Sequence, residues 1–341
     1  MRKFLFALIL FIGVLFVMAR FAEVQAIVET LKRGDWRFIL LAVGIVGLWL
    51  LAVASSFHAV YSALGLKETL KRMLPIAAAS NFLNIVAPSA GMSGMAVFIA
   101  EARRMKYSTG RAAVAGAVVL LLDYAAFLFV LALGLVVLFR RNTLDAGEIF
   151  PTVALLAIAL VVAALIYLGM RSAESLGKAL AWMARGVNRI LWPFLKREYL
   201  SEQRAREFAA DAAEGLHLLF KTPQNMIVPA GLALIKQGLL ITILWCSLRA
   251  FQVSFSTGTL IAGFSIGYLF LIVSPTPAGL GFVEGALALA LRSMYVPFSQ
   301  AAIVTLAYRG FTFWLPLLIG MISFRALERT KNGQPYKESS V

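Results

Sequence analysis

Long apolar segments separated by short polar, basic loops cover most of the chain. The hydrocarbon core of a bilayer is about 30 Å thick, so a helix needs about 20 mostly apolar residues to cross it. Five segments meet that length, and the pattern predicts a transmembrane helix over each. They are residues 36–57, 112–139, 151–170, 227–248 and 301–323.

A sixth apolar run covers residues 4–19 and follows Arg2 and Lys3. Residues 24–26 behind it resemble a signal-peptidase site, so a cleaved signal peptide is one interpretation. The apolar run exceeds the usual core of about 7–15 residues in a signal peptide and continues through Phe21. We therefore expect an uncleaved first helix.

Two further apolar stretches are interrupted near the middle by clustered proline and glycine. Residues 75–100 contain the string NIVAPSAGMSG, and residues 259–291 contain SPTPAGLGFVEG. Proline removes a backbone donor and clashes with the preceding turn, so neither stretch is expected to form one straight helix. In the second stretch the arms would be about 24 and about 17 Å long at ~1.5 Å per residue, which is shorter than the bilayer core. We predict two re-entrant helical hairpins, with the motif residues Asn84, Pro88, Gly91 and Gly94 in the first and Pro275, Pro277, Gly279 and Gly281 in the second.

Basic residues are distributed unevenly between the loops. If both interrupted stretches are hairpins, most Lys and Arg lie on the side that holds both termini and the loops 61–74, 101–111 and 171–226. The positive-inside rule assigns that side to the cytoplasm. If both stretches instead crossed the membrane, the chain would have eight spans, the loop 101–111 would face outward, and the asymmetry would be smaller. The charge pattern therefore favours about six spans and two hairpins, with cytoplasmic N- and C-termini.

The order of predicted elements repeats along the chain. A helix, a hairpin and a helix over residues 36–139 are matched by a helix, a hairpin and a helix over residues 227–323. The first triplet starts outside and the second starts inside, so the two halves would be inverted in the membrane. Inverted repeats with interrupted segments at corresponding positions indicate a substrate site near the bilayer midplane.

The connection over residues 171–226 is long and basic, and its apolar residues recur at helical spacing. We expect amphipathic helices on the cytoplasmic surface there, with a solvated linker as the alternative. The expected organisation is thus a single membrane domain over residues 1–325 and a polar tail over 326–341.

Composition agrees with this picture, since 61% of the residues are hydrophobic and 14% are charged. Soluble domains have roughly 45–50% and ~25%, so an ordinary soluble protein is excluded. The net charge of +15 fits loops that face anionic lipid, and we expect no nucleic-acid partner. With one cysteine and two histidines, we expect no metal and no cofactor. The chain has no GxSxG or HExxH signature, and we expect no enzymatic activity.

Four ionisable residues lie inside the apolar segments, namely Asp123, Lys236, Glu284 and Arg309. A charge in that position costs at least ~2.5–3.5 kcal/mol, so it is usually paired, hydrated or functional. Two acids and two bases sum to zero, which allows structural salt bridges. The other interpretation is a water-filled cavity that binds a polar headgroup or relays protons. The sequence leaves open which acid meets which base.

The hairpin motifs leave a similar choice open. A half-helix that starts after Gly281 would present free backbone amides to a phosphate or carboxylate. Glu284 lies in the first turn of that half-helix, where it could cap those amides itself. Asn84 could in the same way satisfy backbone groups of the first hairpin without touching a ligand.

The strings NIVAPSAGMSG, LLLDY, SPTPAGLGFVEG and YRGFTFWLPLLIG resemble motifs of a known family. It is the flippase-like membrane region shared by lysylphosphatidylglycerol synthase/flippases and their stand-alone relatives, and the resemblance covers about residues 36–325. The resemblance implies inward- and outward-facing cavities, translocation of lipids between leaflets, and family-matched polar positions at Asp123, Glu284 and Arg309.

Two departures from the family limit what the resemblance implies. The soluble aminoacyl-transferase domain of the full-length enzymes is missing, so we expect that this chain does not synthesise the lipid. Many relatives place basic residues around the first hairpin motif, where this chain has Ser89 and Ala90. Lysylated phosphatidylglycerol is therefore not assumed as the substrate.

We predict an all-α, polytopic integral membrane protein that acts as a lipid flippase in the cytoplasmic membrane. By alternating access it would carry a lipid with a polar or charged headgroup through a cavity near Asp123, Lys236, Glu284 and Arg309. The alternatives are an integral membrane enzyme acting on a lipid-linked substrate and a non-transporting scaffold of a lipid-synthesis complex.

Overall fold

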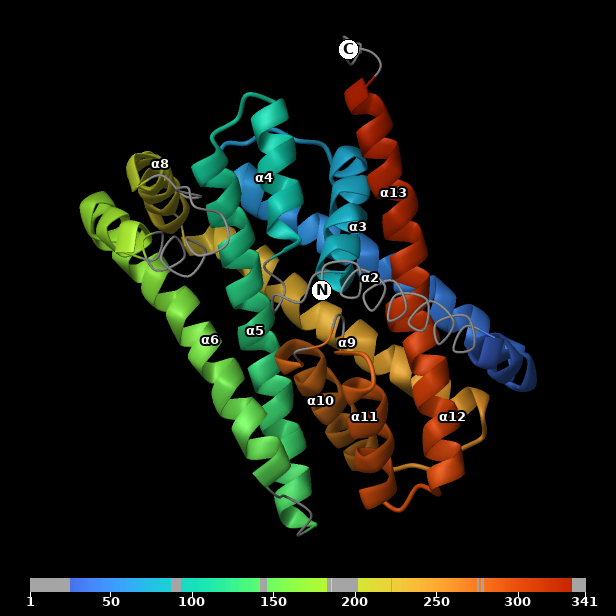
Figure 1. The fold of residues 1–341 in the computed structure, drawn as a ribbon. Coiled ribbons are helices and arrows are strands. Elements are labelled where there is room, and N and C mark those ends of the chain that lie inside the picture. The colour runs from blue at the N-terminus through green and yellow to red at the C-terminus, as the bar shows by residue number, and fades with distance from the viewer. Residues whose placement is uncertain are drawn as a thin grey trace, which may run out of the picture.

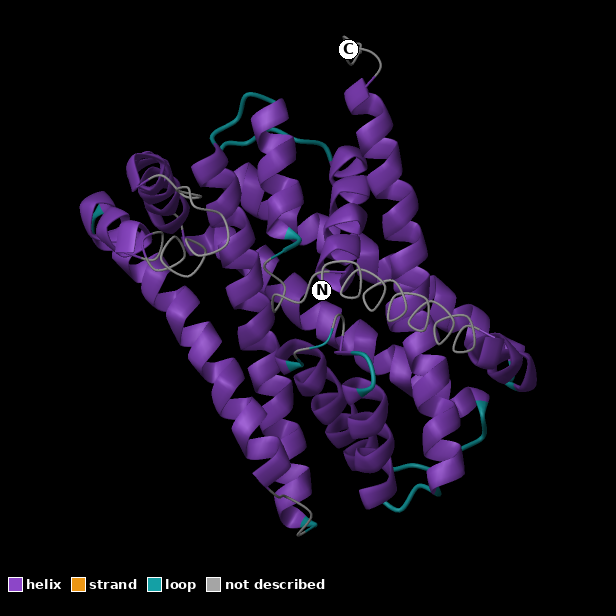
Figure 2. Ribbon diagram, in the orientation of Figure 1, coloured by secondary structure: helices purple, strands orange, loops and turns teal. Residues whose placement is uncertain are grey.

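The computed structural model describes residues 25–86, 93–141, 146–182, 185, 202–221, 223–274, 276 and 279–332. Within these ranges the chain is helical and contains no strand (Figure 2). Several predicted features lie outside the described residues: the apolar run 4–19, the prolines Pro88, Pro275 and Pro277, Gly91, and the tail beyond residue 332.

Five long helical segments dominate the described structure (Figure 1). They are α2 (Trp36–Ala63), α5 (Thr109–Arg140), α6 (Ala146–Arg171), α9 (Ile227–Ala250), and the run of α12 (Phe298–Arg309), η3 (Gly310–Trp314) and α13 (Leu315–Asn332). Four segments are long and apolar enough to cross a membrane, namely Trp36–Ala63, Thr109–Arg140, Gln224–Ala250 and Phe298–Arg329. Two shorter apolar helical stretches are Leu155–Arg171, which is the C-terminal part of α6, and Thr257–Val273. The protein is therefore a multi-pass membrane protein.

Polar caps set the starts of these helices. The Asp35 side chain accepts a hydrogen bond from the Arg37 amide at the start of α2, and the Ser108 side chain accepts one from the Arg111 amide at the start of α5. Such caps satisfy backbone donors that the first turn leaves unpaired. This explains why α5 begins at residue 109, ahead of the apolar core predicted from residue 112.

The two interrupted stretches form pairs of short helices. The first pair is α3 (Leu70–Val86) with α4 (Met95–Arg104), and the second is α10 (Thr257–Val273) with α11 (Phe282–Ser293). At ~1.5 Å per residue these helices are roughly 15–26 Å long, shorter than the ~30 Å bilayer core. In each pair the two helices pack against each other. Figure 1 shows the loops that flank the first pair at one end of the molecule and those that flank the second pair at the other end.

The helix pairs pack in a corresponding way on the long helices. α2 lies along α9, α3 packs on α13, and α10 packs on α5. Glycine permits both of the latter crossings, because a Cβ added at Gly320 would collide with the Ala78 carbonyl and one added at Gly134 would collide with the Ser265 side chain. Small residues at such crossings let helix backbones approach closely in membrane proteins.

The connector between the halves is helical over residues 173–182 and in α8 (Glu202–Lys221), and the short helix η1 (Pro223–Met226) leads into α9. α8 packs on α5 and α6 through buried Ala209, Ala212 and Leu216. Hydrogen bonds join α8 to the start of α5, with Ser108 Oγ donating to Asp211 Oδ2 over 2.9 Å and Arg111 Nη2 donating to Glu214 Oε1 over 2.6 Å.

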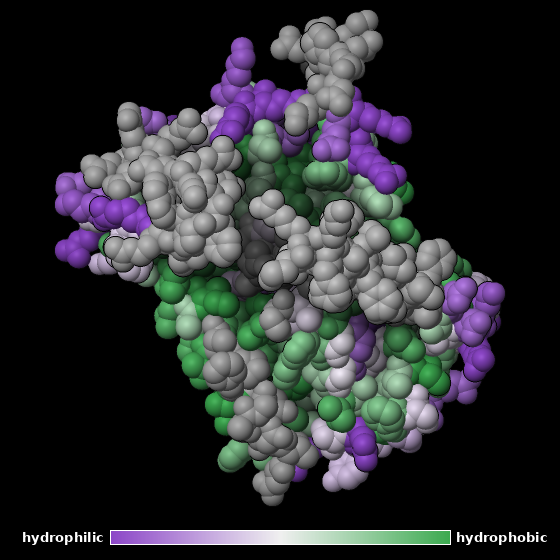
Figure 3. All heavy atoms as spheres, in the orientation of Figure 1, coloured by the Kyte–Doolittle hydropathy of each residue, from purple (hydrophilic) through white to green (hydrophobic). Residues whose placement is uncertain are grey.

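The outer faces of the long helices carry large exposed apolar side chains, including Leu40 on α2, Phe129 on α5 and Leu160 on α6. In Figure 3 hydrophobic residues cover much of the visible body of the molecule, and hydrophilic residues gather at its ends. An apolar outer surface of this extent suits contact with lipid tails.

Candidate functional site

The first buried ion pair joins α5 to α9. Asp123 lies near the middle of α5, and its Oδ1 is 2.6 Å from Nζ of Lys236 on α9. The Lys236 side chain is 4% exposed, whereas the Asp123 side chain is 31% exposed. The ammonium is therefore enclosed, and part of the carboxylate side chain remains accessible.

The second ion pair joins α11 to α12. Nε of Arg309 donates to Oε1 of Glu284 over 2.5 Å, and the Arg309 side chain is only 2% exposed. The guanidinium carbon also lies 4.6 Å from the centre of the Phe313 ring, a cation–π contact. In each ion pair the base is almost fully buried, and the acid that binds it is more exposed.

Glu284 also closes the start of its own helix. The Gly281 amide donates to Glu284 Oε2 over 2.7 Å, so the carboxylate caps α11 as in a capping box. The sequence left open whether the amides at the start of this helix are free for a ligand or capped by Glu284. In the structure Glu284 caps them. Gly281 and Gly279 have φ of 77° and 71°, a region that L side chains adopt at a cost.

An amide side chain has the corresponding role in the first helix pair. Asn84 Oδ1, near the end of α3, accepts hydrogen bonds from the Gly94 amide and from Ser93 Oγ. A Cβ at Gly94 would collide with Ser80 and with Asn84 itself, so glycine is required where α4 begins against α3. Asn84 therefore accepts a hydrogen bond from a backbone amide at the turn between α3 and α4, as one interpretation of the sequence expected.

A π-helical turn follows Arg309. Residues 310–314 form η3, and Pro316 lies two residues further along the same segment. Proline has no N–H to donate to the carbonyl four residues earlier, so the regular ladder is broken at Thr312. π-turns inside helices are frequent at functional sites. This turn was not predicted from the apolar pattern over 301–323.

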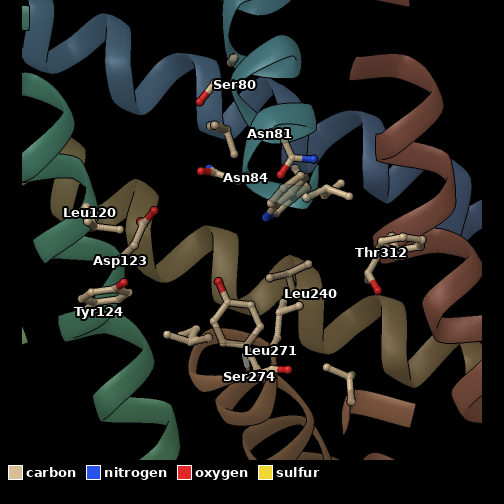
Figure 4. Close-up of a pocket in the computed structure, with 18 of the residues that line it drawn as sticks. Ser80, Asn81, Asn84, Leu120, Asp123, Tyr124, Leu240, Leu271, Ser274 and Thr312 are labelled. Atoms are coloured by element: carbon tan, nitrogen blue, oxygen red, sulfur yellow. The ribbon is translucent and has the colours of Figure 1, made fainter. Parts of the chain in front are cut away.

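A cavity of about 240 Å³ lies where the two sets of helices meet. It is lined from both halves, by α2, α3, α4 and α5 on one side and by α9, α10, the loop after α10, α11, α12 and η3 on the other. Figure 4 shows Ser80, Asn81 and Asn84 on α3 facing the same space as Asp123 and Tyr124 on α5, with Leu240, Leu271, Ser274 and Thr312 around it. The wall is mainly apolar and aromatic with a few polar groups, as in small-molecule sites generally.

The predicted site residues divide between the cavity and its support. Asp123, Arg309 and Asn84 line the cavity. Lys236 and Glu284 lie behind it as the partners of Asp123 and Arg309. Gly94, Gly279 and Gly281 shape the turns of the helix pairs and are not among the residues of the cavity wall.

The family model described as Lysylphosphatidylglycerol synthase TM region matches residues 4–320. The chain belongs to this family. The resemblance predicted from the motifs is confirmed, and the match covers both helix pairs and both ion pairs. A comparison with curated proteins found no match. The chain is thus a multi-pass membrane protein of the lipid-related family of lysylphosphatidylglycerol synthase TM regions.

Several cavity residues of this family member were missed in the sequence. They are Ser80, Asn81, Tyr124, Tyr268, Tyr308 and Thr312. Asn81 lies three residues before Asn84, so the two polar side chains share one face of an apolar helix. That spacing could have indicated that Asn81 also faces the cavity. The tyrosines gave no comparable signal, because tyrosine is also common at membrane interfaces and in cores.

Proposed function

We propose that this protein is a lipid flippase that moves a polar-headgroup lipid between the leaflets of the cytoplasmic membrane. The observation that carries the proposal is the cavity itself, which is polar at Asp123, Asn84 and Asn81 and is lined by both halves of an otherwise apolar helical body. A headgroup needs such a polar path, since crossing hydrocarbon without hydrogen-bond partners costs several kcal/mol per polar group.

Alternating access supplies the mechanism. The headgroup occupies the cavity while the acyl tails stay in contact with the exposed apolar faces of the long helices. The two ion pairs stay intact during the passage, because separating a buried pair leaves an uncompensated charge at a cost of about 3–5 kcal/mol. The cavity then opens to one side or the other by movement of helices along the α2–α9 contact.

The topology we propose has about six spans, two re-entrant hairpins formed by α3–α4 and α10–α11, and two inverted halves. The corresponding packing of α3 on α13 and of α10 on α5 supports it. The N- and C-termini are cytoplasmic in this topology, as the distribution of basic residues indicates. The protein carries out no synthesis of its own, and membrane lipids are its partners.

Cysteine labelling tests the topology, because loops that flank a re-entrant hairpin lie on one side of the membrane. Single cysteines at exposed Lys67 and Lys106 should both react with a membrane-impermeant maleimide only from inside, and those at exposed Gln252 and Tyr295 only from outside. The native Cys246 is buried and serves as the unreactive background. Opposite labelling within either pair of loops would show a full span in place of that hairpin.

Transport is tested in proteoliposomes with lipids that carry a fluorophore on one acyl tail. Dithionite quenches only the outer leaflet, so a flippase raises the quenched fraction from about half towards completion. We expect activity in the wild type and its loss in Asp123→Leu/Lys236→Met. The matched control is Glu174→Gln/Lys178→Gln, which removes a 2.7 Å ion pair that is exposed. Absence of transport for every headgroup would refute the proposal, and a changed lipid mass would favour a membrane enzyme instead.

A further inference from the structure

The charges that face the cavity limit the headgroups it can take. Lys236 is enclosed behind Asp123, and Arg309 is bound by Glu284 and covered by Phe313. Arg309 does line the cavity, but its side chain is 2% exposed and its charge is compensated by Glu284, so neither base offers an uncompensated cation to a phosphate or carboxylate there. Asp123 is accessible, but its charge is compensated by Lys236 at 2.6 Å. The cavity wall thus carries no net charge that would offset the desolvation of an ionic headgroup.

The polar groups that do face the cavity are suited to hydroxyls. The Ser80 and Asn81 side chains form no hydrogen bond with the described part of the chain, and Figure 4 shows the Asn81 amide directed into the cavity. An amide offers both donors and acceptors, and the accessible part of the Asp123 carboxylate offers acceptors. Hydroxyl groups match this set because each can donate and accept.

Aromatic residues make up much of the remaining wall, including Tyr124, Tyr268 and Phe313. Aromatic side chains combine an apolar ring with, in tyrosine, a polar tip. The C–H faces of a sugar ring or polyol pack on such rings while the hydroxyls of the ligand reach the polar groups. The volume of about 240 Å³ leaves room for a small headgroup such as one sugar ring.

From these features we infer that the headgroup recognised by the cavity is uncharged and hydroxyl-rich, a single sugar ring or a short polyol. The inference rests on the proposed flippase function and names its substrate class. Asn81 forms hydrogen bonds with the hydroxyls of the headgroup. Charged headgroups are disfavoured because each base near the cavity is already neutralised by its acid.

The test compares tail-labelled lipids in proteoliposomes of the wild-type chain. The probes are a monoglucosyl diacylglycerol, a zwitterionic phosphatidylethanolamine, an anionic phosphatidylserine and a lipid with a cationic headgroup. We expect the monoglucosyl lipid to move at least tenfold faster than each charged probe. Equal or faster movement of any charged probe would overturn the inference and leave the flippase proposal standing, whereas no movement of any probe would refute both.

Two substitutions at Asn81 separate recognition from folding. Asn81→Leu should lower the rate for the monoglucosyl lipid about three- to tenfold, the effect of one neutral hydrogen bond. Asn81→Asp, which has nearly the same shape, adds a negative charge and should raise the rate of the cationic probe relative to the monoglucosyl lipid. The control Thr242→Val removes a hydroxyl on α9 that bonds to the Gly238 carbonyl away from the cavity, and should leave the preference unchanged. An unchanged preference in Asn81→Asp would contradict the inference.

Discussion

The Asp123–Lys236 pair allows a quantitative prediction about stability. Each single substitution leaves one ion buried without its partner, at a cost of about 3–5 kcal/mol. Asp123→Leu should lie near the upper value, because the ammonium it leaves is 4% exposed. Lys236→Met should lie near the lower value, because the carboxylate it leaves is 31% exposed to the cavity.

The double variant Asp123→Leu/Lys236→Met should recover most of that loss. Two apolar side chains of similar volume often replace a buried ion pair at no cost, so its free energy of unfolding should lie within about 1 kcal/mol of wild type. Transport should nevertheless be lost, since the cavity loses the Asp123 carboxylate that faces the headgroup. Stability and activity are thereby separated in one protein.

Unfolding in mixed micelles with increasing SDS, followed by tryptophan fluorescence, gives the free energies for the four proteins. A double-mutant cycle then gives the coupling energy between Asp123 and Lys236, for which we expect several kcal/mol. If the two single losses add up in the double variant, the side chains do not form a buried pair, and the reasoning fails. Losses below about 1 kcal/mol in both single variants would mean that the site is fully hydrated and would refute it equally.

Three further predictions concern the helix starts and can be checked by the same SDS titration. Gly94→Ala should lower the free energy of unfolding by about 1–3 kcal/mol, because the new methyl group collides with the backbone of α3. The control Gly44→Ala has nothing near its Cβ and should be neutral or stabilising. Equal effects of the two substitutions would contradict the close approach of α4 to α3. Gly281→Ala should lower the free energy of unfolding by roughly 1–2 kcal/mol, because alanine adopts the φ of 77° at this position only at a cost. The control is Gly285→Ala in α11, where an added Cβ meets nothing. A neutral result for Gly281→Ala would contradict the positive φ. Ser108→Ala removes the N-cap of α5 and should lower the free energy of unfolding by about 1 kcal/mol. Ser108→Asn, which can also cap a helix, should lower it less. Equal losses in the two variants would argue against the cap.

Apolar length and helix breakers were enough to place most helices of this chain. The four longest spans fall on predicted segments, and the two interrupted stretches divide into short helices at the predicted motifs. The helix limits differ by several residues, because they are set by single polar caps such as Ser108 and by turns beyond the apolar core. α2, for example, continues to residue 63, past the predicted end at residue 57.

The partners within the ion pairs could not be read from the sequence. Charge arithmetic gives a neutral quartet, but it does not say that α5 faces α9 at Asp123 or that α11 faces α12 at Glu284. Those pairings depend on tertiary packing between residues far apart in the chain. Asn81 was overlooked for a related reason, since only the packing of α3 shows that its side chain reaches a cavity.

The crossed packing of the helix pairs has a consequence for biosynthesis. α3 belongs to the early part of the chain, yet it packs on α13, the last helix described. A ribosome that adds about 5–20 residues per second needs roughly 10–50 s to pass from the end of α4 to the end of α13. During that interval α3, with its polar Ser80, Asn81 and Asn84, can pack on α2 but lacks α13. Insertion of this protein therefore requires either lipid or an assisting insertase to shelter the first helix pair until translation is nearly complete.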